Sequence, residues 1–354
     1  MKIYGSLIGL FLLVVAINGC TYWVDTYEKP PEKCNSGIYG VPDIPGWKIK
    51  IIPIADTFSF LRELYFIDDS KGLLFSNVGI WLTENDGKTW GKVFNSLSIL
   101  VYDISFVDQF HGFVSATVDN HSCILSTKDG GHDWSTIYYY PGGRIVHLSF
   151  VDSLMGYGSF WYQSNLPNES RAFNAKTLNG GVTWEEIPTL SASNGERLTI
   201  KMSPSGFGFI PGSGGEIHLT NDFGENWSTL QTGLNRFSQN QFLDSKTGFV
   251  SDDDNLYKTV DGGMLWTIIS EYHPGMFYFF SALDGISIQT VASYFDYDVT
   301  ENCNAFLTTS DGGLTWIEGP ASINFYLKDF NFINDKIGYG FNTSFPYTLI
   351  KFYR

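Results

Sequence analysis

The sequence predicts an all-β protein built from seven repeated four-stranded units, and two recurring motifs carry this prediction. The first, the Thr-to-Trp motif, reads Thr, then Asn or Asp two residues on, Gly two further and Trp three further, and it occurs six times. The second reads a large apolar residue followed six positions later by Gly, and it occurs seven times. Successive Trp residues of the first motif lie 39 to 50 residues apart. This spacing is typical of a β-propeller, in which each repeat forms one blade.

The Thr-to-Trp motif is expected to form a tight turn between the third and fourth strands of a repeat. A short acceptor side chain can bond backbone N–H groups inside such a turn, and Gly permits the positive φ that it needs. The Trp then begins the next strand, where it can cover the turn and pack against the adjoining repeat. The acceptor positions of the six copies are Asn85, Asp129, Asn179, Asp222, Asp261 and Asp311.

The second motif is interpreted as the innermost strand of a blade, a tight turn and the second strand. Its large apolar residues, called anchors below, are Phe66, Phe106, Phe150, Met202, Phe242, Phe279 and Phe332. Residues one and three before the anchors are mostly polar, which predicts a polar row facing a solvated central channel and an apolar row between blades. His147 and the acids of that row are expected to line the channel rather than to bind a metal, because their spacing matches no metal site.

The two ends of the chain are expected to complete one blade together. The last copy of the second motif has no Thr-to-Trp motif after it, whereas the segment from Trp47 to Ile51 looks like the strand that follows such a motif. We therefore predict that this N-terminal strand joins the blade formed by about residues 325–354 and closes the ring. The predicted organisation is a signal peptide at residues 1–19, a tether at 20–45 and a seven-bladed propeller at 46–354.

The six Thr-to-Trp motifs resemble the Asp-box, or BNR, motif of sialidases, sortilin-type ectodomains and the propellers related to the photosystem II assembly factor. In those families the box lies at the blade periphery and is structural, so this resemblance implies a structural role for the six acceptor residues. The chain resembles most closely the propellers related to the photosystem II assembly factor. That resemblance implies an assembly or interaction module.

The N-terminus carries one Lys, an apolar run from Leu7 to Ile17 and then Cys20, which resembles a bacterial lipoprotein signal. The run is too short to remain as a membrane span. The resemblance implies that Cys20 becomes the lipidated first residue of an extracytoplasmic protein in the bacterial cell envelope, at the outer membrane or cell surface. Asn18 departs from the usual small residue, and an ordinary signal peptide with an incidental Cys is the alternative.

Charge and cysteine content exclude several classes of partner and site. The formal net charge of −15 becomes −16 without residues 1–19, whose charged side chain is Lys2, and this argues against nucleic acid or anionic lipid as the main partner. Cys34, Cys123 and Cys303 form no C-x-x-C pair, so no zinc or redox site is expected; a Cys34–Cys303 disulfide is the preferred pairing. We expect a monomer without cofactor or metal.

Candidate binding residues fall on the predicted loop face, the side of the ring opposite the two tight turns of each blade, where binding sites normally lie. Four of the six Arg residues occur four to six positions before an anchor, at the expected mouth of the channel: Arg62, Arg144, Arg197 and Arg236. Guanidinium groups there would suit a carboxylate-bearing ligand or an acidic partner loop, and pairing with nearby acids such as Glu63 or Glu196 is the alternative. A blade connection from Tyr138 to Arg144, a long loop from Trp161 to Arg171 and a long loop insert from Gln289 to Asn304 supply aromatic candidates: Tyr139, Tyr140, Trp161, Tyr162, Tyr294, Phe295 and Tyr297. Recognition of a partner and packing between inserts are both open interpretations of these aromatics.

The function expected from these features is binding of a protein, peptide or glycan partner through the loop face, without catalysis. The alternative is a sialidase-like or other Asp-box glycoside hydrolase, in which an Arg cluster holds a sugar carboxylate. Three observations weaken this alternative. The chain has no Arg-Ile-Pro segment near its first blade, seven blades are predicted instead of six, and no pair of carboxylates can be assigned a catalytic separation.

Overall fold

The computed structural model describes residues 46–54, 61–164, 169–193, 199–234, 237–252, 254–271, 275–295, 298–318, 327–342 and 348–354. All of them belong to one unit of the chain, which begins at Cys34. The predicted signal peptide and tether, with Cys20 and Cys34, lie outside the described residues. Among the residues that are described, no helix has the length and apolar character needed to cross a membrane.

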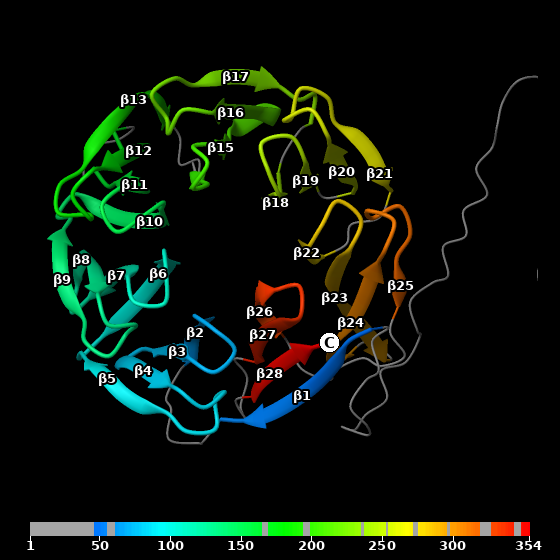
Figure 1. Ribbon diagram of the computed structural model, residues 1–354, viewed down its shortest axis with the longest axis horizontal. Helices are drawn as coiled ribbons and strands as arrows, with labels where there is room; N and C mark the ends of the chain where they lie inside the picture. The colour runs from blue at the N-terminus through cyan, green and yellow to red at the C-terminus, as the bar shows by residue number, and fades with distance from the viewer. Residues whose placement is uncertain are drawn as a thin grey trace, which may run out of the picture. The chain divides into compact units, whose positions relative to one another are not determined.

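The fold is a ring of seven four-stranded antiparallel sheets, as predicted (Figure 1). Blades 1 to 3 are β2 (Leu61–Phe66), β3 (Gly72–Ser76), β4 (Gly79–Thr83) and β5 (Gly91–Asn95); β6 (Ile99–Phe106), β7 (Gly112–Val118), β8 (His121–Thr127) and β9 (Ser135–Tyr139); and β10 (Gly143–Phe150), β11 (Gly156–Tyr162), β12 (Arg171–Thr177) and β13 (Glu185–Ser193). Blade 4 is β14 (Lys201–Met202), β15 (Gly208–Pro211), β16 (Glu216–Thr220) and β17 (Ser228–Gln231), with the 3₁₀ turn η1 (Ser213–Gly215) between β15 and β16. Blade 5 is β18 (Gln239–Phe242), β19 (Gly248–Ser251), β20 (Leu256–Thr259) and β21 (Thr267–Ser270). Blade 6 is β22 (Met276–Phe279), β23 (Gly285–Phe295), β24 (Asp298–Thr309) and β25 (Ile317–Glu318).

Blade 7 is assembled from both ends of the propeller. It contains β26 (Leu327–Asn334), β27 (Ile337–Asn342) and β28 (Thr348–Tyr353), and its outer strand is β1 (Lys48–Pro53). The ladder between β1 and β28 runs from Lys48 opposite Tyr353 to Pro53 opposite Thr348, and Figure 1 shows the blue and red strands side by side. The predicted closure of the ring is therefore confirmed.

A repeated stack of side chains joins neighbouring blades. In blade 3 the ring of Trp184 lies edge-on to the anchor Phe150, with ring centroids 6.0 Å apart. The other face of Phe150 stacks on Phe113 of blade 2 at 3.5 Å. The Trp of the motif thus packs on the anchor of its own blade, and the anchor makes the contact with the preceding blade. Stacked aromatic pairs of this kind add to the stabilisation from apolar burial.

The same stack explains why Gly recurs six residues after each anchor. The anchor ring lies across the first residue of the second strand, and a Cβ at Gly72 would lie 2.9 Å from the ring of Phe66. Any larger residue would displace the anchor from the contact between blades. The second motif is therefore a packing signal for the inter-blade stack.

The six Thr-to-Trp motifs fold into one type of turn. In blade 2 the hydroxyl of Thr127 accepts a hydrogen bond from the N–H of Gly131 (2.8 Å) and donates one to the carboxylate of Asp129 (2.8 Å). That carboxylate also accepts the N–H of Asp133 (3.0 Å). Gly131 has a φ of 93°, so the predicted need for positive φ is confirmed. The acceptor residues hold the turn together, since their oxygen atoms bind backbone N–H groups that no ladder partner reaches.

The polar row of the inner strands does more than line a channel. The side chain of Gln241 in β18 donates to the carbonyl oxygen of Phe279 (2.9 Å) and accepts from its N–H (2.8 Å), so it binds the inner strand of the next blade. Similar contacts join Asp103 to Leu148, Ser105 to Phe150, Ser149 to Met202 and Gln239 to Phe277. Inner strands are sheet edges whose backbone groups need partners, and the ring brings the preceding blade within reach of them.

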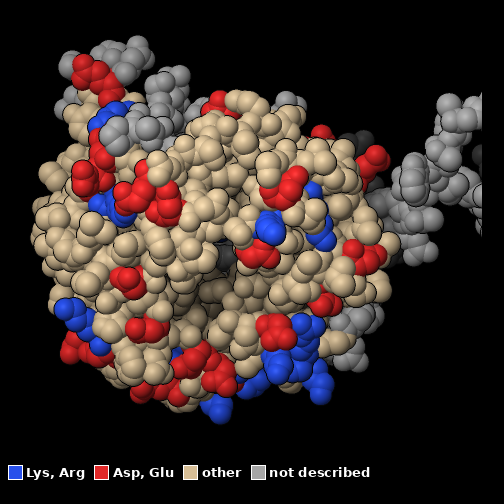
Figure 2. Space-filling view, turned by 45° about the horizontal axis from the view of Figure 1, so that its top comes forward, with Lys and Arg blue, Asp and Glu red and all other residues tan. Residues whose placement is uncertain are grey.

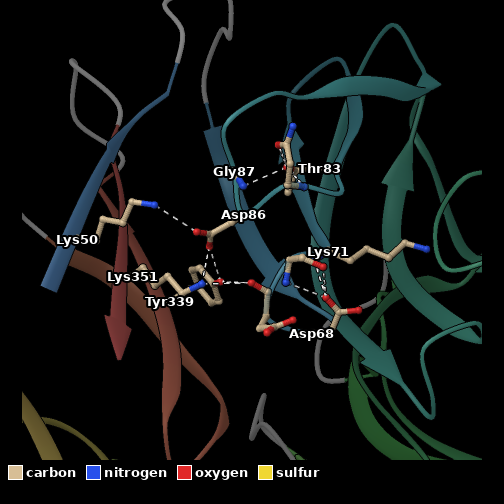
Figure 3. A network of polar contacts seen from close by, with 11 residues as sticks. Lys50, Asp68, Lys71, Thr83, Asp86, Gly87, Tyr339 and Lys351 are labelled. Carbon is tan, nitrogen blue, oxygen red and sulfur yellow. Dashed lines mark hydrogen bonds and ion pairs between the residues drawn. The ribbon is translucent and has the colours of Figure 1, made fainter. Parts of the chain in front are cut away.

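A network of charged groups links blade 7 to blade 1 (Figure 3). The carboxylate of Asp86, in the Thr-to-Trp turn of blade 1, accepts hydrogen bonds from Lys351 (2.7 Å), Tyr339 (2.7 Å) and Lys50 (3.3 Å). Tyr339 and Lys351 also donate to the carbonyl oxygen of Asp69. Side chains from strands at both ends of the propeller therefore meet at one carboxylate of blade 1.

Candidate functional site: the loop end of blade 3

Three of the predicted binding residues meet where β10 begins and β11 ends, on the loop face of blade 3. Arg144 lies opposite Trp161 in the ladder, and Tyr162 lies opposite Gly143. The side chains of Arg144 and Tyr162 are exposed, and that of Trp161 is half-buried. The indole N–H of Trp161 donates to the side-chain oxygen of Gln163 (3.2 Å). Arg144 and Trp161 therefore lie on one face of this strand end, and Tyr162, the next residue of β11, lies on the other face.

Two glycines allow the connection between β9 and β10 to lie close against the end of β11 and its aromatic side chains. A side chain at Gly143, whose φ is 154°, would collide with the carbonyl oxygen of Trp161. A Cβ at Gly142 would lie 3.1 Å from the rings of both Tyr140 and Tyr162. The backbone of Gly142 also accepts the N–H of Gln163 (2.8 Å), which fixes the connection against the end of β11.

Tyr140 packs against two aromatic side chains of blade 3 next to the site. Its ring lies edge-on to Phe160 at 5.3 Å and to Phe173 at 6.4 Å, and these two rings stack on each other at 5.2 Å. Burial raises the pKa of Tyr140 to about 12, so its hydroxyl remains protonated at neutral pH. Tyr140 packs between inner side chains, whereas Tyr162 presents 38% of its surface to solvent.

An ion pair missing from the predicted set borders these aromatics. The guanidinium of Arg171, opposite Tyr162 in the ladder, donates to both carboxylate oxygens of Glu186, one of them at 2.7 Å. It also lies over the ring of Phe173 at 4.7 Å. The hydrogen bonds from Arg171 lower the pKa of Glu186 and outweigh the opposing effect of burial. The two charges compensate each other beside the aromatic rings.

Sequence reasoning could have found this pair only from the strand register. Arg171 ends the segment that the sequence presents as a long loop, and no motif marks Glu186. The contact depends on an irregularity of the β12–β13 ladder between Phe173 and Ala175, which sets Glu186 opposite Ala175. The available signal was two opposite charges on adjacent strands of one hairpin, 15 residues apart.

Other predicted residues lie apart from this cluster or outside the described residues. Tyr139 is 62% exposed but belongs to blade 2, opposite Cys123 and edge-on to His121. Arg62 is exposed at the irregularity of β2 in blade 1, with blade 2 between it and Arg144. Arg197, Arg236 and Tyr297 lie outside the described residues. The structure therefore places Arg144 opposite Trp161 in one ladder and does not bring Arg62 to that position.

The segment from Gln289 to Asn304 is a hairpin, so its prediction as a loop was wrong. β23 and β24 remain paired from Gly285 opposite Thr309 to Phe295 opposite Asp298. Tyr294 and Phe295 lie near its tip. The structure describes the backbone of these two residues and of Cys303, but not their side chains. The cause lies in the sequence itself, because the residues from Ile286 to Phe295 are rich in β-branched and aromatic types and contain no charge.

The centre of the ring is hollowed, and the visible wall of this hollow is mostly neutral (Figure 2). His147 and Asp103 of adjacent inner strands form a pair with 2.6 Å between Nδ1 and Oδ2, and both are largely buried. Within the described part of the chain, no group of three or more His, Cys, Asp or Glu is arranged to hold a metal ion. The thiol of Cys123 is buried, and its burial raises its pKa to about 11.

No protein-family model matches the chain. It is 26% identical over 186 residues to the chloroplast photosystem II stability/assembly factor HCF136 of Arabidopsis thaliana; the match covers 49% of this chain and 44% of that protein, less than half its length.

Solved structures show a similar fold. YCF48 bound to a D1 peptide superposes with a TM-score of 0.62 at 17% identity, covering 89% of this chain and 100% of that chain. YCF48 from Cyanidioschyzon merolae gives 0.61 at 17%, covering 86% and 98%, and the WD40 propeller of Doa1 gives 0.55 at 14%, covering 85% and 95%. The fold is that of a seven-bladed β-propeller similar to YCF48.

Proposed function

We propose that the protein is an extracytoplasmic propeller of the bacterial cell envelope, lipid-anchored through Cys20, that binds a protein, peptide or glycan partner through its loop face. The loop end of blade 3 makes the main contact. The six Thr-to-Trp turns are Asp-boxes with a structural role, and the protein works as a monomer without catalysis. Nucleic acid is not its partner, because the chain is strongly acidic.

The observation that carries this proposal is the set of Arg144, Trp161 and Tyr162 at one strand end. Trp, Tyr and Arg are the residue types that contribute most to binding energy at protein interfaces. Here they lie on the paired ends of β10 and β11, before the ladder irregularity between Ile145 and His147, rather than in a long loop. A rigid backbone lowers the entropy that is lost when a partner binds.

The similarity to known propellers supports a binding role. One of the similar structures, YCF48, holds a D1 peptide, and its whole chain is covered by this fold. The matched curated relative is a stability and assembly factor. A protein or peptide partner is therefore favoured over a glycan.

The test compares partner capture by three variants of the full chain in membrane extract. Trp161→Ala/Tyr162→Ala should lose the captured partner, with at least a tenfold fall in yield, and Arg144→Ala should weaken capture. Phe110→Ala is the matched control, since Phe110 is an aromatic residue 51% exposed in a turn on the opposite face. Equal capture by the wild type and the double variant would refute the proposed site. Arg144→Ala/Arg236→Ala tests the predicted Arg set in the same assay.

Two further experiments address the anchor and the hydrolase alternative. Cys20→Ser should move the protein from the membrane fraction to the soluble fraction. A screen against sialosides and glucans should show no turnover. Turnover that Arg144→Ala abolishes would favour a glycoside hydrolase instead.

A further inference from the structure

Apolar side chains gather on the turn face of blades 5 and 6, the side of the ring that carries the two tight turns of each blade. Their exposed fractions are 67% for Val260, 71% for Met264, 67% for Leu265, 56% for Leu283 and 61% for Leu314. We call these five residues the turn-face patch. Blade 4, which has Glu225 at the place of Met264, separates the patch from blade 3. Grouped apolar exposure of this kind marks a contact surface.

Hydrogen bonds join the four turns that carry the patch. In blade 5 the N–H of Gly262 donates to a carbonyl oxygen of the turn between β18 and β19 (2.8 Å), and in blade 6 the N–H of Gly312 donates to the carbonyl oxygen of Leu283 (2.7 Å). The ammonium group of Lys258 in blade 5 donates to the carbonyl oxygen of Ala282 in blade 6 (2.6 Å). The patch therefore rests on turns that are tied to one another within and between the two blades.

Carboxylates share these turns with the patch. One Asp lies in each of the four turns: Asp244, Asp261, Asp284 and Asp311. Hydrogen bonds from backbone N–H groups of their own turns lower the pKa of Asp244 and Asp261, so both carboxylates are charged at neutral pH. Residues 237–318, which contain blades 5 and 6, have 12 Asp and Glu residues, two Lys and no Arg. The electrostatic potential around the patch is therefore negative.

Blade 3 has apolar turn residues without this excess of negative charge. Leu154, Leu178 and Val182 are 60%, 63% and 53% exposed in its two turns. Residues 143–193, which contain the strands of blade 3, have four acidic and three basic residues. Blade 3 therefore offers a matched surface on the same face of the ring, similar in its apolar side chains and nearly balanced in charge.

We propose that the turn-face patch binds a basic amphipathic segment of a partner protein, whose apolar side chains cover the patch and whose Lys or Arg side chains lie at the four carboxylates. Burial of apolar surface drives the contact, and the opposite charges select the partner. A second copy docked through the same patch would bring two sets of carboxylates together, and the headgroups of an anionic membrane would be repelled by them. The inference does not depend on the proposed function, because Arg144, Trp161 and Tyr162 lie on the loop face.

The test measures the binding of a fluorescent peptide to the full chain carrying Cys20→Ser, so that no lipid is attached, by fluorescence anisotropy. The peptide has about 18 residues, with Leu on one helical face and Lys on the other. Met264→Ser/Leu314→Ser removes two large apolar side chains from the patch and should weaken binding roughly tenfold or more. Leu178→Ser/Val182→Ser is the matched control in blade 3 and should leave the affinity unchanged.

Two further comparisons test the charge and the face. Asp244→Asn/Asp284→Asn keeps a side-chain oxygen for the hydrogen bonds within each turn and removes two charges, so it should weaken binding roughly threefold and reduce its salt dependence. Equal affinities for the Lys peptide and for the same peptide with Glu in place of Lys would overturn the proposal. Trp161→Ala/Tyr162→Ala should leave the affinity unchanged, so failure of the loop-face site and failure of this inference give different results.

Cross-linking of the wild type keeps the test valid if a variant is unstable. The Lys peptide with a photoreactive benzophenone should cross-link to residues 260–265 and 310–315, as mapped by mass spectrometry. Cross-links confined to the loop face, or equal affinities of the wild type and Met264→Ser/Leu314→Ser, would overturn the proposal. So would vesicle binding or dimerisation that this variant abolishes without losing affinity for the peptide, because a membrane or a second copy would then be the occupant of the patch.

Discussion

We call the contact between two neighbouring blades a seam, and two seams of the ring invite comparison: that between blades 3 and 4, and that between blades 7 and 1. In each, a Tyr hydroxyl and a Lys ammonium group are the donors, but the acceptors differ. At the blade 3–4 seam, Tyr157 donates to the carbonyl oxygen of Phe223 (2.5 Å), and Lys176 donates to the same oxygen (3.2 Å). Lys176 also pairs with Glu225 (2.6 Å), whose side chain is 70% exposed. The acceptor at this internal seam is a backbone carbonyl, and the ion pair lies at the surface.

At the closing seam Tyr339 and Lys351 take the places of Tyr157 and Lys176. Each Tyr follows the Gly of the second motif, Gly156 or Gly338, and each Lys lies opposite the Tyr in the ladder. Their main acceptor is the side chain of Asp86, which is 19% exposed. A carboxylate bound by two ammonium groups and a phenol makes a stronger contact than a neutral carbonyl.

At both seams, the turn that accepts the hydrogen bonds contains a residue with a strained, positive φ. Asp86 and Phe223 have φ values of 62° and 58°, at the position where the other four turns have Gly. A residue other than Gly pays about 1–2 kcal/mol in this region. In blade 4 the Phe223 ring packs over Gly206, where a Cβ would lie 2.9 Å away. In blade 1 the side chain at this position is the centre of the closing network.

The difference between the seams follows from chain separation. The hydrogen bonds of the blade 3–4 seam join residues 47 and 66 apart, whereas those of Asp86 to Tyr339 and Lys351 join residues 253 and 265 apart. Loop-closure entropy grows by about 0.6 kcal/mol for each doubling of separation, or roughly 1 kcal/mol here. We infer that the charged network at the closing seam offsets this larger cost.

The largest loss of stability is expected from Asp86→Ala, at the closing seam. It removes three hydrogen bonds and leaves Lys351, only 14% exposed, without its carboxylate. We expect a loss of about 2–3 kcal/mol in the free energy of unfolding, measured by urea denaturation, even though Ala cannot relieve the positive φ. Hydrogen exchange should rise first in β1 and β28. A loss below about 0.5 kcal/mol would show that the network does not hold the ring closed.

A second comparison uses Tyr339→Phe and Tyr157→Phe, which remove one hydroxyl from each seam. The one hydroxyl proton of Tyr339 is shared by two oxygen acceptors, the Asp86 carboxylate and the Asp69 carbonyl, whereas that of Tyr157 is shared by the Phe223 carbonyl and the weaker acceptor Sδ of Met155. We expect a loss of about 2 kcal/mol for Tyr339→Phe and about 1 kcal/mol for Tyr157→Phe, from their melting temperatures and unfolding enthalpies. The reverse order would contradict the stronger role of the closing seam.

Acid should weaken the closing seam specifically. Burial alone would raise the pKa of Asp86, but the hydrogen bonds from Lys351 and Tyr339 and the Lys351 charge together lower it. A carboxyl whose pKa is lowered by folding stabilises the protein above its unfolded pKa of about 4, and this contribution is lost as the pH falls through the folded value. The stability gap between the wild type and Asp86→Asn should therefore be widest near pH 7 and narrow below about pH 4. A gap independent of pH would show that charge is not the source of the effect.

Sequence patterns predicted the number of blades and the closure of the ring better than they predicted contacts between side chains. Blade number and closure followed from the spacing of Trp47 and the two motifs, because each repeat must bury the same face against its neighbours. The network around Asp86 could not be predicted, since it depends on which side chains of the last blade reach the first. At the candidate site, Arg144 and Trp161 lie on strands whose register fixes their approach, whereas the Arg171–Glu186 pair depends on a ladder irregularity that no short motif encodes.

The smallest expected effect separates the ion pair of the internal seam from its hydrogen bonds. Glu225→Gln removes the charge that faces Lys176 but keeps the Tyr157 and Lys176 contacts to the Phe223 carbonyl. Exposed ion pairs contribute little, so we expect a change below about 0.5 kcal/mol, and it should disappear at 1 M salt. Urea unfolding at low and high salt measures both quantities. A loss as large as that of Asp86→Ala would mean that surface charge, rather than a largely buried carboxylate shared by distant parts of the chain, determines how firmly neighbouring blades hold together.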